Sequence, residues 1–98
     1  MNARRWHPIR LPSVKAARCI EDGELDFVFI DGEHSYETAR SDIEAWWPKV
    51  SSGGLLMGHD YHRPRSPGVC RAVDEFGEEH GLKVGKRGHS VWFIRKGR

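Results

Sequence analysis

The stretch LDFVFIDGEHSY, residues 25–36, decides the fold, because an apolar run ends abruptly in two acids, a glycine and a histidine. Apart from one acid, residues 25–30 are apolar and rich in aromatic and β-branched side chains, which is typical of a strand covered on both faces. Asp31 and Gly32 end this strand. We interpret the acids and the imidazole that follow it as the rim of a ligand site.

A helix is expected directly after this strand. From Tyr36 to Val50, apolar residues recur at steps of three and four, the period of a helix with one buried stripe. Ser35 is a suitable N-cap, since its hydroxyl can accept an amide proton of the first turn. Pro48 ends the helix near Trp47, because proline lacks an amide proton and clashes with the preceding turn.

The middle of the chain repeats this alternation of strand and helix. SSGG, residues 51–54, predicts a turn, and LLMGHDY, residues 55–61, begins apolar and ends polar as the first strand does. Ser66 and Pro67 are typical of the start of a helix, and Gly81 is typical of its end. A second helix is therefore expected between them.

Strand-like runs at the two ends complete the pattern. The C-terminal stretch LKVGKRGHSVWFIRK predicts an antiparallel hairpin around Arg87-Gly88. HPIRL, residues 7–11, is another strand-like run, and residues 13–23 predict a helix after it. The expected order is β-α-β-α-β-α-β-β. Strands separated by helices indicate right-handed parallel crossovers, hence an α/β three-layer sandwich with an antiparallel edge pair.

The composition fits one small globular domain. The 98 residues are 38% hydrophobic and 31% charged, with a mean hydropathy of -0.65, which argues against disorder. No apolar run approaches the roughly 20 residues of a membrane span, and the N-terminus lacks the apolar region of a secretory signal, so a cytoplasmic protein is expected. Cys19 and Cys70 lack the spacing of a metal or redox motif and predict buried thiols.

Polar clusters follow both core strands of the predicted sheet. Because the carboxyl ends of parallel strands share one edge, we expect the two clusters to come together. Their carboxylates and imidazoles could hold a divalent metal or supply a general base near neutral pH. The first cluster is Asp31, Glu33 and His34, and the second is His59, Asp60, Tyr61 and His62.

Several spaced motifs resemble one known family. Residues 25–61, followed by PGVCRAVDEF at residues 67–76 and VWFIRK at residues 91–96, resemble the C-terminal half of class I S-adenosylmethionine-dependent methyltransferases. The group with a D-G-x-H-S-Y motif, here residues 31–36, is the most similar, and the resemblance covers about residues 13–96. It implies a Rossmann-like partial sheet and S-adenosylmethionine as methyl donor.

The resemblance also implies roles for individual residues. Asp31, His34 and Asp60 would be catalytic, although His34 could equally be a structural hydrogen-bonding residue. Metal-dependent members have acids or amides as ligands at the positions of Asp31, His59 and Asp60, and histidine is a poor ligand for Mg²⁺. Tyr61 would line the substrate pocket or pack on the lip of the sheet.

The donor-binding half of that family is not found in this sequence. Its glycine-rich loop and ribose-binding acid have no counterpart before residue 25. We therefore expect residues 1–98 to be a single truncated methyltransferase-like domain, incomplete or inactive as an isolated chain. Residues 1–12 would be an edge strand or arm and residues 13–98 the α/β core.

An open sheet edge beside residues 25–30 predicts a partner, because unpaired backbone groups invite association. One solution is internal, with residues 7–11 pairing directly beside residues 25–30, and the other is a partner chain or a symmetric dimer. We expect a mixture of both, with residues 1–12 and the edge helix as the interface. The alternative function is a non-catalytic module that binds a small molecule or an ion, or that assembles through this edge. The uneven charge blocks are expected to be solvated faces, and a nucleic-acid partner is not expected.

Overall fold

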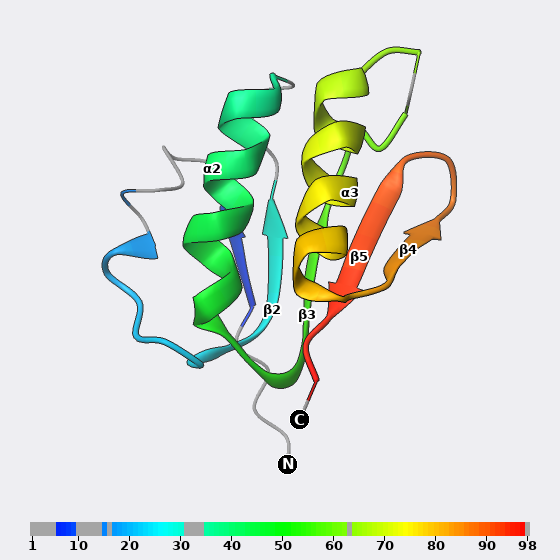
Figure 1. Ribbon diagram of the computed structural model, residues 1–98. Coiled ribbons are helices and arrows are strands. Elements are labelled where there is room, and N and C mark those ends of the chain that lie inside the picture. Colours follow the sequence, from blue (N-terminus) through cyan, green and yellow to red (C-terminus); the bar gives the residue numbers. More distant parts are fainter. Residues whose placement is uncertain (1–5, 10–14, 16, 31–34, 63, 98) are drawn as a thin grey trace.

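The computed structural model describes residues 15, 17–30, 35–62 and 64–97, and the backbone of residues 6–9. Within these residues it contains one five-stranded sheet, two α-helices and a short 3-10 helix (Figure 1). In chain order these are β1 (Trp6–Ile9), β2 (Leu25–Ile30), α2 (Tyr36–Trp46), η1 (Trp47–Lys49), β3 (Val50–Gly58), α3 (Pro67–His80), β4 (Val84–Arg87) and β5 (Val91–Arg95).

The sheet is mixed and has the order β1-β2-β3-β5-β4. β1, β2 and β3 are parallel, and β5 runs antiparallel to both of its neighbours. The predicted C-terminal hairpin is confirmed, with Gly88 in the left-handed conformation at its turn. The predicted N-terminal strand is also confirmed, because Ile9 pairs with Ile30 and β1 lies directly beside β2.

Both helices lie on the same face of the sheet, as Figure 1 shows, so α2, α3 and the sheet form two layers. The third layer that the sequence predicts is not found among the described residues. The strand order explains this difference. The connections from β2 to β3 and from β3 to β4 move across the sheet in one direction, and right-handed crossovers in one direction put their helices on one face.

The predicted first helix, at residues 13–23, is only partly described. Lys15 and Ala17 are helical, and residues 18–20 already form a turn and a bend, so this helix stops well before Gly23. Residues 10–14 and 16 lie outside the described part of the chain. The described element order therefore departs from the predicted β-α-β-α-β-α-β-β at this helix.

The covered face of the sheet, which we define as the face toward α2 and α3, forms the core. Alternate residues of β2, β3 and β5 are buried here, because side chains of a strand point to opposite faces in turn. Trp46 of α2 and Phe76 of α3 are the largest side chains packed among them. The strand residues of this face are Val28, Ile30, Leu56, Trp92 and Ile94, each 7% exposed or less.

The open face of the sheet, which we define as the opposite face, is also apolar. Its residues come from the same three strands and pair in rows, since Phe27 lies beside Leu55 and Phe29 lies beside Met57. All of them are half-buried rather than buried. The apolar residues of the open face are Phe27, Phe29, Leu55, Met57 and Phe93, and Arg95 lies on the same face beside Leu55.

Residues 51–54 lie within β3, so the predicted turn at SSGG is wrong. The N–H of Gly53 donates to the carbonyl of Lys96 at 2.8 Å, and the N–H of Lys96 donates to the carbonyl of Gly54 at 2.8 Å. The β2–β3 register shifts beside these residues, so the ladder absorbs the glycines as an irregularity instead of ending there.

Helix ends follow the sequence signals. Ser35 caps α2 by accepting the N–H of Thr38 at 3.2 Å, and α2 ends one residue before Trp47 as Pro48 requires. Gly81 has the left-handed conformation expected after α3. Of the helices in the described residues, none has the length and apolar character that a membrane span needs.

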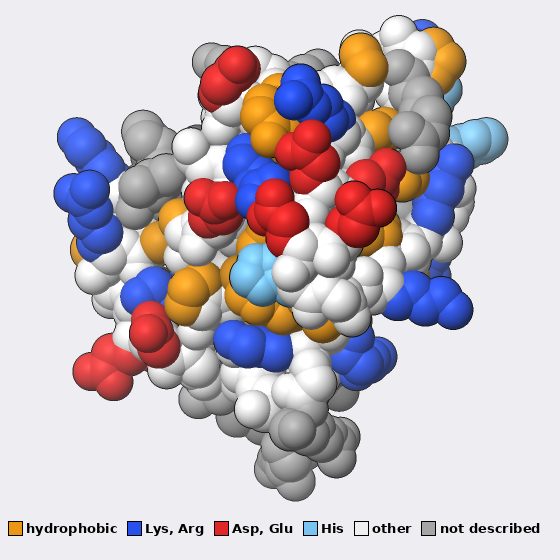
Figure 2. Space-filling model, in the orientation of Figure 1, with side chains coloured by type: hydrophobic (Ala, Val, Ile, Leu, Met, Phe, Trp, Pro, Cys, Tyr) orange, Lys and Arg blue, Asp and Glu red, His pale blue; other side chains and the backbone are white. Residues whose placement is uncertain are grey.

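An ionic network ties α2 to α3 on the outer surface, where Figure 2 shows acids and bases gathered together. The hydroxyl of Tyr36 donates to Glu75 at 2.5 Å, and this bond lowers the pKa of Glu75 and raises the pKa of Tyr36. Arg71 lies 4.3 Å above the Tyr36 ring and also bonds Glu75. Arg40 bonds Glu79 on the neighbouring helix.

Candidate functional site

The carboxyl ends of β2 and β3 meet, as the sequence predicts. Ile30 pairs with Gly58, so the loops that follow the two strands start side by side. Asp31 and His34, together with Glu33, lie outside the described residues, and their roles stay predictions. The described side of this edge begins with His59 and Asp60, directly after β3.

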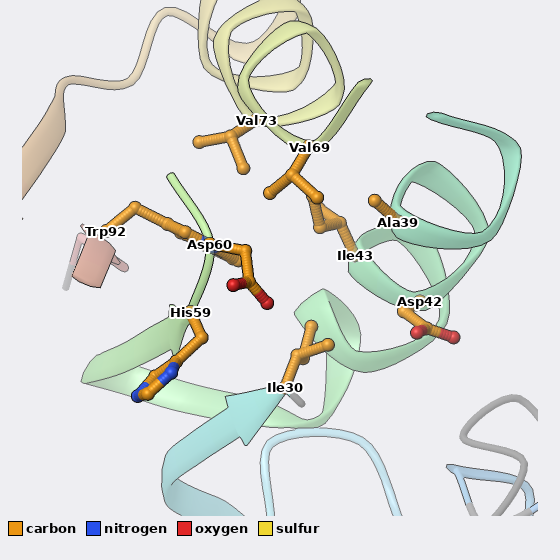
Figure 3. Close-up of a pocket in the computed structure, with 9 residues that line it drawn as sticks. All are labelled: Ile30, Ala39, Asp42, Ile43, His59, Asp60, Val69, Val73 and Trp92. Atoms are coloured by element: carbon orange, nitrogen blue, oxygen red, sulfur yellow. The ribbon is translucent and has the colours of Figure 1, made fainter. Parts of the chain in front are cut away.

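A small pocket lies at this edge, between the sheet and the two helices (Figure 3). Its volume is about 20 Å³, which is room for a single water molecule. Most of its lining is apolar. The lining residues are Ile30, His59, Asp60 and Trp92 from the sheet side, Ala39, Asp42 and Ile43 from α2, and Val69 and Val73 from α3.

Gly58, at the end of β3, leaves room for the ring of Trp92 beside this pocket. A methyl group at Gly58 would lie 2.6 Å from the ring of Trp92, which is far closer than two carbon atoms approach. The absence of a side chain therefore lets Trp92 lie flat over β3 and form one wall of the pocket.

Asp60 has an unusual backbone conformation. Its φ is +68°, and it is the only residue other than glycine with a positive φ in the described part of the chain. This conformation costs a non-glycine residue roughly 1–2 kcal/mol, although aspartate tolerates it better than most. In Figure 3 the carboxylate of Asp60 points into the pocket, toward Ile30.

His59 points away from the Asp60 carboxylate (Figure 3). Its ring packs edge-on against Phe29, with 5.0 Å between the ring centroids, and Phe29 belongs to the open face. His59 is exposed. The side chains of His59 and Asp60 therefore lie on different sides of the sheet. Of the two, only Asp60 points its side chain into the pocket.

Asp42 is an acid of the pocket that the sequence analysis missed. It is buried, with 4% of its surface exposed, and its carboxylate points away from Asp60 in Figure 3. Its position gave a usable signal, because it falls between Ala39 and Ile43 on the apolar stripe of α2. A charged residue on the buried side of a helix is unusual.

The described residues do not fit a metal or the methyl donor. They contain no group of three His, Cys, Asp or Glu side chains that could hold a metal ion. The predicted ligand set Asp31, His59 and Asp60 includes one residue outside the described part, and the other two point apart. A pocket of about 20 Å³ is also far too small for a nucleoside.

Tyr61 lies against α3 rather than in the pocket. Its hydroxyl donates to Asp74 Oδ1 at 2.6 Å, and its N–H donates to the carbonyl of Ser90 at 2.9 Å. It also packs on the core and does not line the pocket. Of the two sequence-based alternatives for Tyr61, these contacts correspond to packing on the lip of the sheet.

Comparison with known proteins identifies the family. A family model described as a methyltransferase domain matches residues 2–61, which is more than half of the chain. The chain belongs to the methyltransferase domain family. The matched region of this methyltransferase domain runs from β1 through β3 and includes Asp60.

Solved structures support the assignment. The O-methyltransferase NovP is 25% identical with a TM-score of 0.64, and the match covers 76% of this chain and 30% of NovP. MycE methyltransferase, solved in complex with Mg and SAH, is 23% identical with a TM-score of 0.60, covering 87% and 28%. An O-methyltransferase family protein from Burkholderia thailandensis is 15% identical with a TM-score of 0.60, covering 93% and 35%. The last two show the shared fold alone.

Curated relatives match over a shorter region. Protein y4gI of Sinorhizobium fredii is 35% identical over 52 residues, and protein R132 of Acanthamoeba polyphaga mimivirus is 36% identical over 52 residues. The matches cover 53% and 52% of this chain but only 6% and 24% of those proteins. The methyltransferase domain described here thus spans a small part of its relatives.

Proposed function

We propose that this chain forms the methyl-acceptor side of an S-adenosylmethionine-dependent O-methyltransferase, and that it needs further polypeptide to bind the methyl donor. The observation that supports it most is Asp60, held in a left-handed conformation with its carboxylate aimed into the pocket. Strained residues of this kind gather at functional sites. A carboxylate there would accept the proton of a hydroxyl group as that oxygen is methylated.

Asp31 and His34 are proposed to act at the same edge. Asp31 directly follows Ile30, which pairs with Gly58 just before the second acidic loop. His34 would then orient the acceptor or share its proton, as an imidazole does near neutral pH. A divalent metal would require Asp31 together with Asp60, since His59 points to the other side of the sheet.

The sheet topology supports the proposal that the donor site needs further polypeptide. Ligands of open α/β sheets bind where the strand order reverses, because loops diverge there. The described strands run from β1 to β3 without a reversal, and β1 is the edge. Strands added beyond β1 would create the reversal, and their helices would cover the open face.

Calorimetry with S-adenosylmethionine tests the donor part of this proposal. The chain alone, with or without Mg²⁺, should give no binding heat at millimolar ligand. A chimera in which this chain replaces the matching region of NovP should bind the donor and methylate the hydroxyl acceptor of NovP. Donor binding by the 98-residue chain alone would contradict the proposal.

The role of Asp60 needs a separate variant of the chimera. Asp60→Asn keeps a residue type that tolerates a positive φ but removes the charge, so the fold should persist while methyl transfer falls by about 10²–10⁴-fold. Donor binding measured on the same variant should stay unchanged. Full activity of Asp60→Asn would exclude Asp60 as the proton acceptor.

The alternative is an assembly module that forms a symmetric dimer. The specific observation in its favour is the apolar open face, which continues to the β1 edge through the pairing of β1 with β2. A second copy of this chain would cover both features at once. Sedimentation analysis of the purified chain distinguishes a dimer from a monomer whose open face binds a different polypeptide.

A further inference from the structure

Tyr61 is fastened by two elements outside its own loop. It belongs to the β3–α3 loop, residues 59–66, and follows Asp60 directly. Its hydroxyl bonds Asp74 of α3 at 2.6 Å, and its N–H bonds Ser90, in the turn before β5, at 2.9 Å. The position of Tyr61 is thus set at both ends, by a helix and by the hairpin.

The same loop is closed around Tyr61. The N–H of His62 donates to the carbonyl of Asp60 at 2.8 Å, which makes a three-residue turn with Tyr61 at its centre. The N–H of Ser66 then donates to the carbonyl of His62 at 2.7 Å, and Ser66 is 2% exposed at the start of α3. These two bonds restrict the backbone on the C-terminal side of Asp60.

A left-handed aspartate persists only where its surroundings outweigh its own preference. The contacts of Tyr61 are part of these surroundings, because Asp60 shares a peptide bond with Tyr61. If Tyr61 were released, Asp60 could relax to a negative φ. The carboxylate of Asp60 would then no longer point into the pocket.

We infer that Tyr61 is a positioning residue, which together with Asp74 holds Asp60 in its left-handed conformation and keeps the Asp60 carboxylate aimed into the pocket. The functional value of this arrangement rests on the proposed function, since Asp60 needs a fixed direction only if it faces a ligand. The conformational statement itself can be tested without any ligand.

The experiment reads φ at Asp60 by NMR on the 98-residue chain. A positive φ brings the amide hydrogen close to Hα of the same residue and gives a strong intraresidue NOE. Tyr61→Phe removes the bond to Asp74 and should weaken that NOE at Asp60 clearly. Asp74→Ala removes the same bond from the other partner, should have the same effect, and serves if Tyr61→Phe does not fold.

Two matched variants separate positioning from a general loss of stability. Tyr36→Phe removes an equivalent tyrosine–carboxylate bond, to Glu75 of α3, and should leave the Asp60 NOE unchanged. Asp74→Asn keeps an oxygen that accepts the Tyr61 hydroxyl and should preserve the NOE.

An unchanged Asp60 NOE in folded Tyr61→Phe or Asp74→Ala would overturn the inference. So would an equal loss in Tyr36→Phe, because the effect would then reflect stability alone. Since no ligand is present, failure of the chain or the chimera to bind S-adenosylmethionine would count against the proposed function and not against this inference.

Discussion

The two faces of the sheet use the same strands and are both largely apolar, yet only one of them is a core. On the covered face, Leu56 and Trp92 lie beneath α2 and α3 and have almost no exposed surface. On the open face, Leu55 and Phe93 remain half-buried. The apolar side chains of a strand show which of its faces could be buried. The direction of the crossovers decides which face the helices of the chain actually cover.

Leu55 and Leu56 give the most direct test of this comparison, since they are adjacent and chemically identical. Leu56→Ala should lower the free energy of unfolding by about 2–5 kcal/mol, because it leaves a cavity beneath the helices. Leu55→Ala should cost about 1 kcal/mol, because its side chain is only half removed from water. Urea unfolding measures both, and equal losses would show that the open face is covered in solution.

Two glycines extend the test to overpacking. A methyl group at Gly58 meets the ring of buried Trp92 at 2.6 Å, and one at Gly85 meets the ring of Phe93 at 2.2 Å. Gly58→Ala should cost about 1–3 kcal/mol, because Trp92 has no room to move. Gly85→Ala should cost less, since Phe93 can swing toward solvent on the open face. Thermal unfolding compares them, and a larger loss at Gly85 would contradict a mobile Phe93.

Association tests whether a second copy covers the open face. If the chain dimerises there, Met57→Lys should weaken the dimer by about tenfold, or roughly 1.4 kcal/mol, because a charge enters an apolar contact. Ser41→Lys adds the same charge on the exposed side of α2 and should have no effect. Sedimentation over a range of concentrations gives both constants. A monomer at every concentration would remove the dimer and leave the face for a different polypeptide.

The smallest expected effect is on the pH dependence of stability, through the contact between α2 and α3, the helices that cover the sheet. Glu75 has a lowered pKa in the folded chain, chiefly because Tyr36 donates to it and then because Arg71 does. This stabilisation is present above the ordinary glutamate pKa of about 4.3 and is lost as the pH falls through the lower folded value. Melting temperatures between pH 6 and 3 should therefore fall less steeply in Tyr36→Phe than in the wild type. Identical slopes would show that the pKa of Glu75 does not depend on the bond from Tyr36.

Much of the fold could be predicted from local signals. The apolar run of β2, the Ser35 cap and the left-handed Gly81 each depend on a few neighbouring residues, and the structure confirms them. The turn predicted at residues 51–54 was wrong because Gly53 and Gly54 pair with Lys96, a residue distant in sequence. The predicted third layer is not found among the described residues for a similar reason, since the face that a helix covers depends on strand order.

The candidate site was predictable in its location but not in its geometry. Polar residues after two adjacent strands correctly indicated the edge where β2 and β3 end. The left-handed conformation of Asp60 depends on bonds from other elements to its neighbours, and no local pattern encodes those. The bond between Tyr61 and Asp74 spans a loop and a helix, and the opposite directions of His59 and Asp60 follow from that loop.

The place of β5 in the sheet also has a consequence for how the protein is made. β5 lies between β3 and β4 but is synthesised after both. Until β5 is in place, the folding chain exposes the edge of β3 that β5 later covers. During this interval the nascent chain should be most vulnerable to aggregation and most dependent on chaperones.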